Sequence, residues 1–323
     1  MPPERLTALP RFTPMLATPG PLPPPAHQES FGFEVKQDGQ RAMVYVPGDG
    51  TVTLRSRTGA DITAAYPELA ALGSALDRPA VLDGEIVAFD DQGRSDFELL
   101  QSRMGLSGSP SKAALMAQRV PAHLILFDVV FLAARPIAKL PYHERRDVLE
   151  GLGLTDAHWS TPASVVGHGT QALEMTKTAG LEGLVAKRLT SVYEPGVRSR
   201  AWIKIRHVRT LDVIVGGWVP GHGRLTGLPG ALLLGERGED GLRYAGSVGT
   251  GWSDTERETL AELLQAATID RCPFTEVPPV AGARWVLPRL VGEVRYATRT
   301  RAGRLRQPSW HRLRPDLAPE DIT

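Results

Sequence analysis

The chain has 323 residues and a mass of 35.0 kDa, and its 42% hydrophobic and 23% charged content is that of a soluble globular protein with room for two domains. Its single cysteine, Cys272, cannot form an internal disulfide and fits a reducing compartment. The N-terminal residues lack the apolar core of a signal peptide, and the most apolar run, 124–134, is too short to span a bilayer. We therefore expect a cytoplasmic protein that does not bind membranes.

The chain begins with a proline-rich arm, residues 2–25, which predicts an extended lead-in and not a helix. Three stretches then alternate as strands do: 31–35, 41–46 and 51–57. Asp38-Gly39 lies between the first two, as in a hairpin turn. The pattern predicts an antiparallel meander with Lys36 at its first corner.

Helices and strands are mixed up to about residue 207. Tyr66, Leu69, Leu72 and Leu76 have helical spacing. Ser95 and Glu98 have the spacing of a capping box that opens a helix reaching Met104, and a further helix is expected at 142–151. The remaining strands are predicted at 81–89, 124–132, 181–189 and 201–207. This half of the chain is predicted to be α+β, with antiparallel sheets and flanking helices.

The sequence changes character from Leu211 onward, where short strands rich in glycine follow one another. One helix interrupts them, with a second capping box at Ser253 and Glu256. This pattern is typical of a small Greek-key barrel of oligonucleotide-binding (OB) type. We expect two domains, 1–208 with the proline-rich arm and 209–323 with the barrel.

Positive charge is concentrated near the C-terminus although the net charge is only +1. Nine arginines lie there against one acid, Glu293: Arg284, Arg289, Arg295, Arg299, Arg301, Arg304, Arg306, Arg312 and Arg314. Such a segment suits phosphate groups of a nucleotide or a nucleic acid. A general arginine bias of the sequence is the alternative explanation.

Lys36 sits in an apolar stretch and is followed by Asp38, Gly39 and Arg41. A lysine amine is a nucleophile only after losing a proton, and neighbouring cations or a metal ion favour that loss. The spacing predicts a lysine that attacks a phosphate. Asp-Gly turns beside charged residues are also common in hairpins, so the motif alone leaves both interpretations open.

Further charged and aromatic residues extend this pattern along the chain. Asp83 and Glu85 alternate on one strand and share a face, and Glu182 begins another strand. Such carboxylates suit Mg²⁺, which neutralises phosphate charge. Phe127 is placed to stack on a base, and Lys204 with Arg206 forms a possible phosphate clamp. Taken singly, the acids could be surface residues, Phe127 core, and the two cations a solvated strand face.

Together these motifs resemble those of ATP-dependent DNA ligases, most closely the compact bacterial enzymes and the ligase domain of bacterial end-joining enzymes. The resemblance runs through PMLA, KQDGQR, SRTG, LDGEI, FDVVF, EGLVAKR, WIKIR and RLRQPSWHRLRPD, in that order. It implies a nucleotidyltransferase domain followed by an OB-fold β-barrel. It also implies the use of ATP as AMP donor with Mg²⁺ or Mn²⁺, and the sealing of nicked duplex DNA in repair or end joining.

The resemblance also implies roles for individual residues. Lys36 would be the nucleophile that carries AMP, and Glu34 the acid that reads the adenine amino group. Contacts to ATP or AMP are implied for Arg41, Arg57, Glu85, Phe127, Lys204, Arg206, Arg314 and Asp316. Metal contacts are implied for Glu182, Glu85 and Asp83, and DNA contacts for Arg57, Arg295, Arg304 and Arg306.

Three positions depart from the family pattern: Gln37 stands where relatives commonly have tryptophan, Arg206 where they have lysine, and Leu317 where they have a basic residue. Two other functions share parts of the pattern, a guanylyltransferase of the messenger-RNA capping kind and a DNA-end binder without catalysis. Labelling with ATP or GTP separates them. We expect a monomer, with end-binding or polymerase proteins acting in trans.

Overall fold

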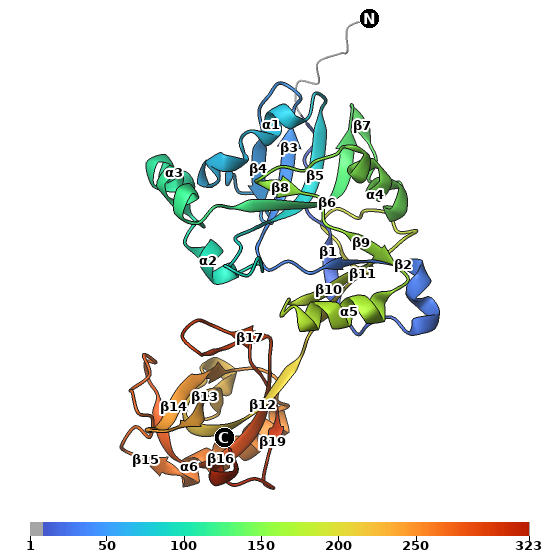
Figure 1. Ribbon diagram of the computed structural model, residues 1–323. Helices are drawn as coiled ribbons and strands as arrows, with labels where there is room; N and C mark the ends of the chain where they lie inside the picture. Colours follow the sequence, from blue (N-terminus) through green and yellow to red (C-terminus); the bar gives the residue numbers. More distant parts are fainter. Residues whose placement is uncertain (1–8, 323) are drawn as a thin grey trace, which may run out of the picture. The chain divides into compact units, whose positions relative to one another are not determined.

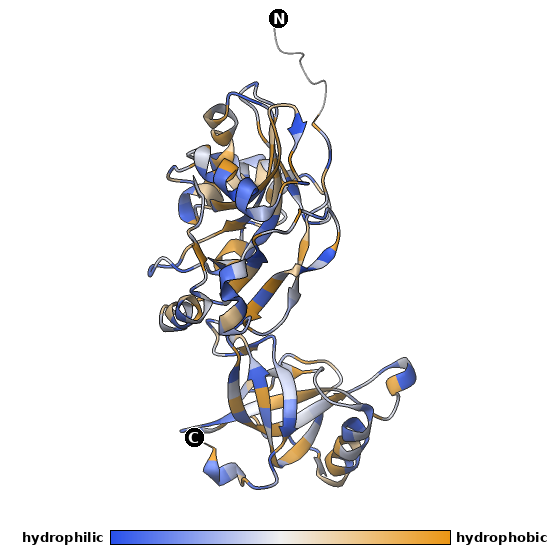
Figure 2. Ribbon diagram, turned by 90° about the vertical axis from the view of Figure 1, so that its right-hand side faces the viewer, coloured by the Kyte–Doolittle hydropathy of each residue, from blue (hydrophilic) through white to orange (hydrophobic). Residues whose placement is uncertain are grey.

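The computed structural model describes residues 9–322 and divides into two compact units that meet at Arg206 and His207 along the chain (Figure 1). Each unit has its own hydrophobic core, and hydrophobic residues concentrate on the strands (Figure 2). Within residues 9–322, no helix is long and apolar enough to cross a membrane.

The first unit contains two sheets. Sheet A has the strand order β1 (Leu16–Pro19), β11 (Arg198–Arg206), β10 (Gly183–Arg188), β2 (Phe31–Val35) and β9 (Ser164–Val166). Sheet B has the order β4 (Thr53–Ser56), β3 (Gln40–Val46), β5 (Ala80–Val87), β6 (His123–Leu132) and β7 (Arg135–Pro136), with β8 (Trp159–Ser160) pairing with β6. The expectation of antiparallel sheets with flanking helices is confirmed for most strand pairs, while β1 with β11 and β6 with β8 pair in parallel.

Side chains alternate between the two faces of each strand in this unit, and the two faces pack into different core clusters. On β3, Ala42, Val44 and Val46 pack into one core cluster, while Met43 and Tyr45 point to the other face of sheet B. That second cluster also contains Trp202 of sheet A, so it lies between the two sheets. The outer face of sheet A packs against α5 (Gly169–Thr178). The space between the sheets is therefore lined by every second residue of several strands.

The prediction of an antiparallel meander is wrong at residues 36–39, between β2 and β3. β2 pairs with β10 and β9 of sheet A, whereas β3 pairs with β4 and β5 of sheet B. Residues 36–39 are a crossing from one sheet to the other. Glycine is required at Gly39 because a Cβ atom there would lie 2.1 Å from the carbonyl oxygen of Ile86. The Asp-Gly pair thus marks close backbone packing and not a hairpin.

The helices differ from the sequence-based expectation in two places. The pattern at 66–76 forms only short pieces, since Pro67 restarts the chain as a 3₁₀ turn and α1 covers only Leu72–Ala75. The N-cap of α2 (Phe97–Gln101) is Asp96, whose carboxylate accepts hydrogen bonds from the amides of Glu98 and Leu99, so Ser95 does not cap it. The helix also ends before Met104.

Three further helical elements follow the prediction or add to it. α3 covers Pro110–Arg119, α4 covers Tyr142–Gly151 as expected, and α6 covers Asp254–Ala266. Ser253 caps α6 by accepting a hydrogen bond from the amide of Glu256. The 3₁₀ segments are Pro25–Ser30, Thr63–Ala65, Pro67–Leu69, Leu106–Gly108, Gly223–Leu225 and Pro319–Asp321.

The second unit is the expected OB-type barrel. Its main sheet contains β12 (Arg209–Pro220), β13 (Pro229–Gly238), β14 (Gly241–Val248), β15 (Thr268–Ile269), β16 (Arg284–Tyr296) and β19 (Ser309–Leu313). A separate two-stranded ribbon is formed by β17 (Thr298–Arg299) and β18 (Leu305–Arg306). Hydrophobic and hydrophilic bands alternate along the barrel strands in Figure 2, with Val213, Val215, Leu232 and Leu234 inside.

Candidate active site

A cleft opens between sheets A and B in the first unit. Its walls are side chains that the period of two directs from each sheet toward the other. Sheet A contributes Glu34, Val185, Lys187 and Trp202, sheet B contributes Arg41, Glu85, Ile125 and Phe127, and the crossing contributes Lys36 and Gln37. Residues from distant parts of the sequence thus meet because each lies on an inward-facing strand position.

Lys36 lies at the point where the chain leaves sheet A. Its Nζ is 2.5 Å from Oε2 of Glu182, and its backbone amide donates to the carbonyl of Gly183 at 2.9 Å. The other carboxylate oxygen of Glu182 is 2.8 Å from Nε of Arg206. Glu182 therefore bridges Lys36 and Arg206, three residues that the motifs single out.

Lys204 lies on β11, two residues before Arg206 and on the same face of the strand. Partial burial, together with the nearby Arg206, Arg198 and Lys36, lowers the pKa of Lys204. A gathering of like charges of this kind stabilises a bound anion. The structure thus groups Lys36, Lys204 and Arg206 as a cationic cluster around Glu182.

Asp83 and Arg41 form a bidentate ion pair inside the cleft wall. Nε and Nη2 of Arg41 each lie 2.6 Å from an oxygen of Asp83, and the hydroxyl of Tyr193 donates to Asp83 at 2.5 Å. Asp83 is fully buried. Its oxygens are therefore engaged in fixing Arg41, and Asp83 is not among the residues that line the cleft.

Glu85, the other acid of the same strand, does line the cleft. Burial raises the pKa of Glu85 to about 7, and Arg41 and Lys36 oppose that shift. Within residues 9–322 no group of three or more histidine, cysteine, aspartate or glutamate side chains is arranged around one metal site. Glu182 and Glu85 fit a Mg²⁺ ion that takes its remaining ligands from substrate phosphates and water; Asp83 does not.

Phe127 is half-buried and lines the cleft as expected, but its ring already contacts two cations. The guanidinium of Arg41 is 4.6 Å from the ring centroid and Nζ of Lys187 is 4.5 Å from it. Phe127 also packs edge-on against Trp202. The ring thus serves both the cleft and the packing between the sheets.

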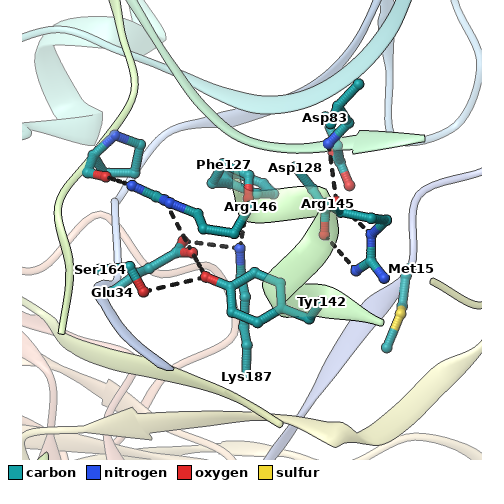
Figure 3. A network of polar contacts seen from close by, with 12 residues as sticks. Met15, Glu34, Asp83, Phe127, Asp128, Tyr142, Arg145, Arg146, Ser164 and Lys187 are labelled. Carbon is teal, nitrogen blue, oxygen red and sulfur yellow. Dashed lines mark hydrogen bonds and ion pairs between the residues drawn. The ribbon is translucent and has the colours of Figure 1, made fainter. Parts of the chain in front are cut away.

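Glu34 lies at the inner end of a polar network (Figure 3). It is 4% exposed, and its Oε2 is 2.8 Å from Nζ of Lys187. Its Oε1 accepts a hydrogen bond from the hydroxyl of Tyr142 and lies 3.5 Å from Nη1 of Arg146. The structure thus holds Glu34 between two cations and one hydroxyl.

Sequence reasoning missed three members of this network: Lys187, Tyr142 and Arg146. Lys187 is almost fully buried and also donates to the carbonyl of Phe127 at 2.9 Å. A signal for Lys187 was present, because it lies two residues after the inward-facing Val185 on a predicted strand. For Tyr142 and Arg146 the sequence held no signal beyond their spacing on one helix face.

The C-terminal motif lies wholly in the second unit. Nη1 of Arg314 is 2.8 Å from Oδ1 of Asp212 on β12, and Nη2 is 2.7 Å from Oδ2 of Asp316. The guanidinium of Arg314 lowers the pKa of Asp316 to about 2. Leu317 packs against an apolar cluster that includes Ile214 and Phe274. A leucine at that position therefore has a packing role in this chain.

The arginines expected to contact DNA are spread over both units. Arg57 is exposed in the turn after β4, outside the cleft lining. Arg295 is exposed at the end of β16, with Nη2 3.2 Å from a ring nitrogen of His311. Arg304 and Arg306 belong to the β17–β18 ribbon, and Arg304 lies over the Tyr244 ring at 5.2 Å. Arg57 therefore belongs to the first unit, and Arg295, Arg304 and Arg306 belong to the second.

Two family models match the chain. The ATP dependent DNA ligase domain matches residues 14–206, and the ATP dependent DNA ligase C terminal region matches residues 226–317. These two segments fall in the first and second units, respectively.

Individual proteins are similar over almost the whole chain. The multifunctional non-homologous end joining protein LigD of Mycolicibacterium smegmatis is 38% identical over 315 residues, which cover 96% of this chain and 39% of that protein. DNA ligase C of Mycobacterium tuberculosis is 34% identical over 350 residues, covering 99% of this chain and 94% of that protein. The chain thus spans well under half of the LigD protein that it matches.

A solved structure of mycobacterial DNA ligase D complexed with ATP and MES agrees with these matches. It is 38% identical to this chain, has a TM-score of 0.57, and the alignment covers 97% of this chain and 98% of that one. Ordered motifs, two sheets around a lysine-bearing cleft, a C-terminal barrel and these likenesses lead to one assignment: the chain belongs to the ATP-dependent DNA ligase family.

Proposed function

We propose that this chain seals nicks in duplex DNA through an AMP-lysine intermediate on Lys36. The observation that carries the proposal is the position of Lys36 at the mouth of the cleft, with its Nζ against Glu182 and with Lys204 and Arg206 near the same carboxylate. Family membership and the likeness to a ligase structure that contains ATP support it.

In the first step the amine of Lys36 attacks the α-phosphorus of ATP. A nitrogen–phosphorus bond forms, the bond to pyrophosphate breaks, and the amine proton passes to solvent. Lys204 and Arg206 would neutralise the α-phosphate, and Phe127 would stack on the adenine while Glu34 receives its amino group. Arg41, fixed by Asp83, and Glu85 would line the sugar and phosphate.

In the later steps AMP moves to DNA. An oxygen of the 5′-phosphate attacks the phosphorus of AMP-lysine, and the amine leaves with a proton. The 3′-hydroxyl then attacks the 5′-phosphate and gives its proton to solvent, AMP departs and the strand is joined. Correct positioning and charge neutralisation dominate such displacements, which suits the many arginines of the chain.

A divalent cation belongs to this proposal. Glu182 and Glu85 would hold Mg²⁺ or Mn²⁺ together with substrate phosphates. When bound, the ion neutralises phosphate charge. Asp83 is left out of the proposed metal site because its side chain is fully buried, with Arg41 and Tyr193 on its oxygens, whereas the side chain of Glu182 is partly exposed.

The second unit would supply Arg314 and Asp316 to the step that releases pyrophosphate, and Arg295, Arg304 and Arg306 to the DNA backbone. Arg57, in the first unit, would contact the nick phosphate. The name of the LigD relatives supports end joining as the setting. End-binding or polymerase proteins would then be partners of this chain. The single cysteine, Cys272, suits a reducing cytoplasm, where the chain would act as a monomer.

Labelling with α-³²P-ATP in Mg²⁺ tests the proposal. The denatured protein is expected to retain label that acid releases, as a phosphoramide does, and the labelled protein is expected to seal a nick without added ATP. Labelling by GTP in preference to ATP would instead indicate a guanylyltransferase. A protein that binds nicked DNA but takes label from neither nucleotide would be a non-catalytic end binder.

A further inference from the structure

Tyr142 and Arg146 lie on one face of α4, four residues apart, and both contact the same carboxylate (Figure 3). Neither residue lines the cleft. Both are nonetheless buried, as is the carboxylate of Glu34 that they contact. α4 therefore presents two donors to Glu34 from behind the cleft wall.

The environment of Glu34 is built specifically to hold this side chain. Gly32, two residues earlier on β2, leaves space for the Tyr142 ring, since a Cβ there would lie 3.0 Å from Cε1 of Tyr142 and 2.9 Å from Oγ of Ser164. Arg146 is fixed in turn by Glu150, whose Oε1 is 2.6 Å from Nε, and by the carbonyl of Pro162. The two donors are thus themselves held in place.

Protonation states follow from the same surroundings. Burial and the adjacent Glu34 raise the pKa of Tyr142 well above its usual value, so the hydroxyl keeps its proton and donates. Glu34 faces two cations, Lys187 on Oε2 and Arg146 on Oε1. Glu34 thus acts as the hydrogen-bond acceptor in this network.

A carboxylate accepts about four hydrogen bonds. Within the described residues, the two acceptor positions of Oε1 are used by Tyr142 and Arg146. One acceptor position of Oε2 is used by Lys187. This leaves Oε2 one position for a donor from the cleft. Adenine offers an N–H donor at its 6-position, whereas guanine offers an oxygen that only accepts.

We propose that Tyr142 and Arg146 are positioning residues that set the preference for ATP over GTP by holding Glu34 with one acceptor position open toward the base. The inference rests on the proposed function, specifically on Glu34 facing the purine. Without the two donors, Glu34 can turn within its site and loses the fixed acceptor that repels the guanine oxygen.

The experiment measures self-labelling with ATP and GTP in wild type and in Tyr142→Phe, which removes only the hydroxyl. The ratio of kcat/KM for ATP to that for GTP is expected to fall about tenfold or more, the loss associated with a hydrogen bond to a charged group. The change should lie mainly in KM. Sealing of a nick that already carries AMP should be unchanged, because the base is then delivered with the DNA.

Tyr66→Phe is the matched control, because Tyr66 is 1% exposed like Tyr142 and its hydroxyl donates to Gln40, away from Glu34. Its nucleotide preference should equal that of wild type. Arg146→Gln is the second variant in case Tyr142→Phe does not fold, and it should lower the same ratio.

The outcomes distinguish a failure of the proposed function from a failure of the inference about Tyr142 and Arg146. Wild type that takes no label from either nucleotide refutes the proposed function. Wild type that prefers ATP, beside a Tyr142→Phe or Arg146→Gln protein that keeps the wild-type ratio while melting earlier, overturns the inference and leaves the network with a purely structural role. A collapsed ratio in Glu34→Gln with an unchanged ratio in both α4 variants overturns it as well.

Discussion

Nζ of Lys36 lies 2.5 Å from Oε2 of Glu182, although 146 positions separate the two residues in the sequence. The contact places the proposed nucleophile against a carboxylate that also holds Arg206. The negative charge of Glu182 therefore compensates the nearby positive charge before ATP binds. The α-phosphate of ATP must compete with Glu182 for Lys36 and Arg206.

The first prediction concerns the nucleophile itself. Lys36→Arg keeps a positive charge beside Glu182 but cannot lose a proton near neutral pH, so AMP attachment should be abolished. Labelling by α-³²P-ATP measures it, with the exposed Lys112→Arg as control. Label on the Lys36→Arg protein would show that another residue carries AMP.

The second prediction separates charge compensation from stability. Glu182→Gln should abolish nick sealing with little change in melting temperature, because the side chain of Glu182 is partly exposed, at 14%. For Glu68→Gln we expect the opposite, a large loss of stability. Glu68 pairs with the fully buried Arg103, and loss of one partner of a buried pair costs about 3–5 kcal/mol. Sealing rates and melting curves on both variants check this; a Glu182→Gln protein that unfolds would make the residue structural.

The third prediction addresses the base. Phe127→Ala should weaken ATP binding by about 1–3 kcal/mol because the base can no longer stack on the ring. It should also lower stability, because the ring contacts Trp202. ATP affinity and thermal unfolding are measured side by side. Reduced stability with unchanged ATP affinity would assign Phe127 to the core alone.

The fourth prediction uses the ion pair between Asp212 and Arg314. Asp212→Asn removes one of the two carboxylates that orient Arg314, and should slow AMP attachment about fivefold. Joining of a pre-adenylated nick should be unaffected. Arg314→Ala should slow attachment severely, and the exposed Asp240→Asn serves as control. Equal losses in both assays would mean that the pair serves folding or DNA binding.

The fifth prediction concerns DNA. Nick binding should weaken steeply with salt, and replacing Arg295, Arg304 and Arg306 by alanine should reduce the slope of log K against log salt by about 0.9 for each DNA phosphate that is no longer neutralised. Arg78→Ala is the control, because Arg78 is exposed and paired with Asp77. An unchanged slope in the triple variant would place the phosphate-binding residues elsewhere.

Some of the residues that line the cleft could be predicted from the sequence, because alternation on strands needs only local spacing. Glu85 and Phe127 both line the cleft, as the motifs imply. The partner strand of β2 could not be predicted in this way. Its pairing with β10 is a contact between distant segments, and the local Asp38-Gly39 signal favoured a hairpin that packing against Ile86 excludes.

The contacts around Glu34 could not be predicted from local spacing either. Tyr142 and Arg146 come from a correctly predicted helix, but the face that α4 turns toward β2 depends on tertiary packing. Asp83 illustrates the converse, since sequence parity places it beside Glu85 while hydrogen bonds to Arg41 and Tyr193 occupy its oxygens.

The backbone amide of Lys36 donates to the carbonyl of Gly183, and β2 pairs with β10 along its length. During synthesis from the N-terminus, Lys36 leaves the ribosome long before the strand that fixes it exists. A nascent chain that ends before Glu182 also lacks Lys187, Lys204 and Arg206. The proposed reaction with ATP therefore cannot begin before sheet A is complete, and a chain that ends earlier should not react even though it already carries the lysine.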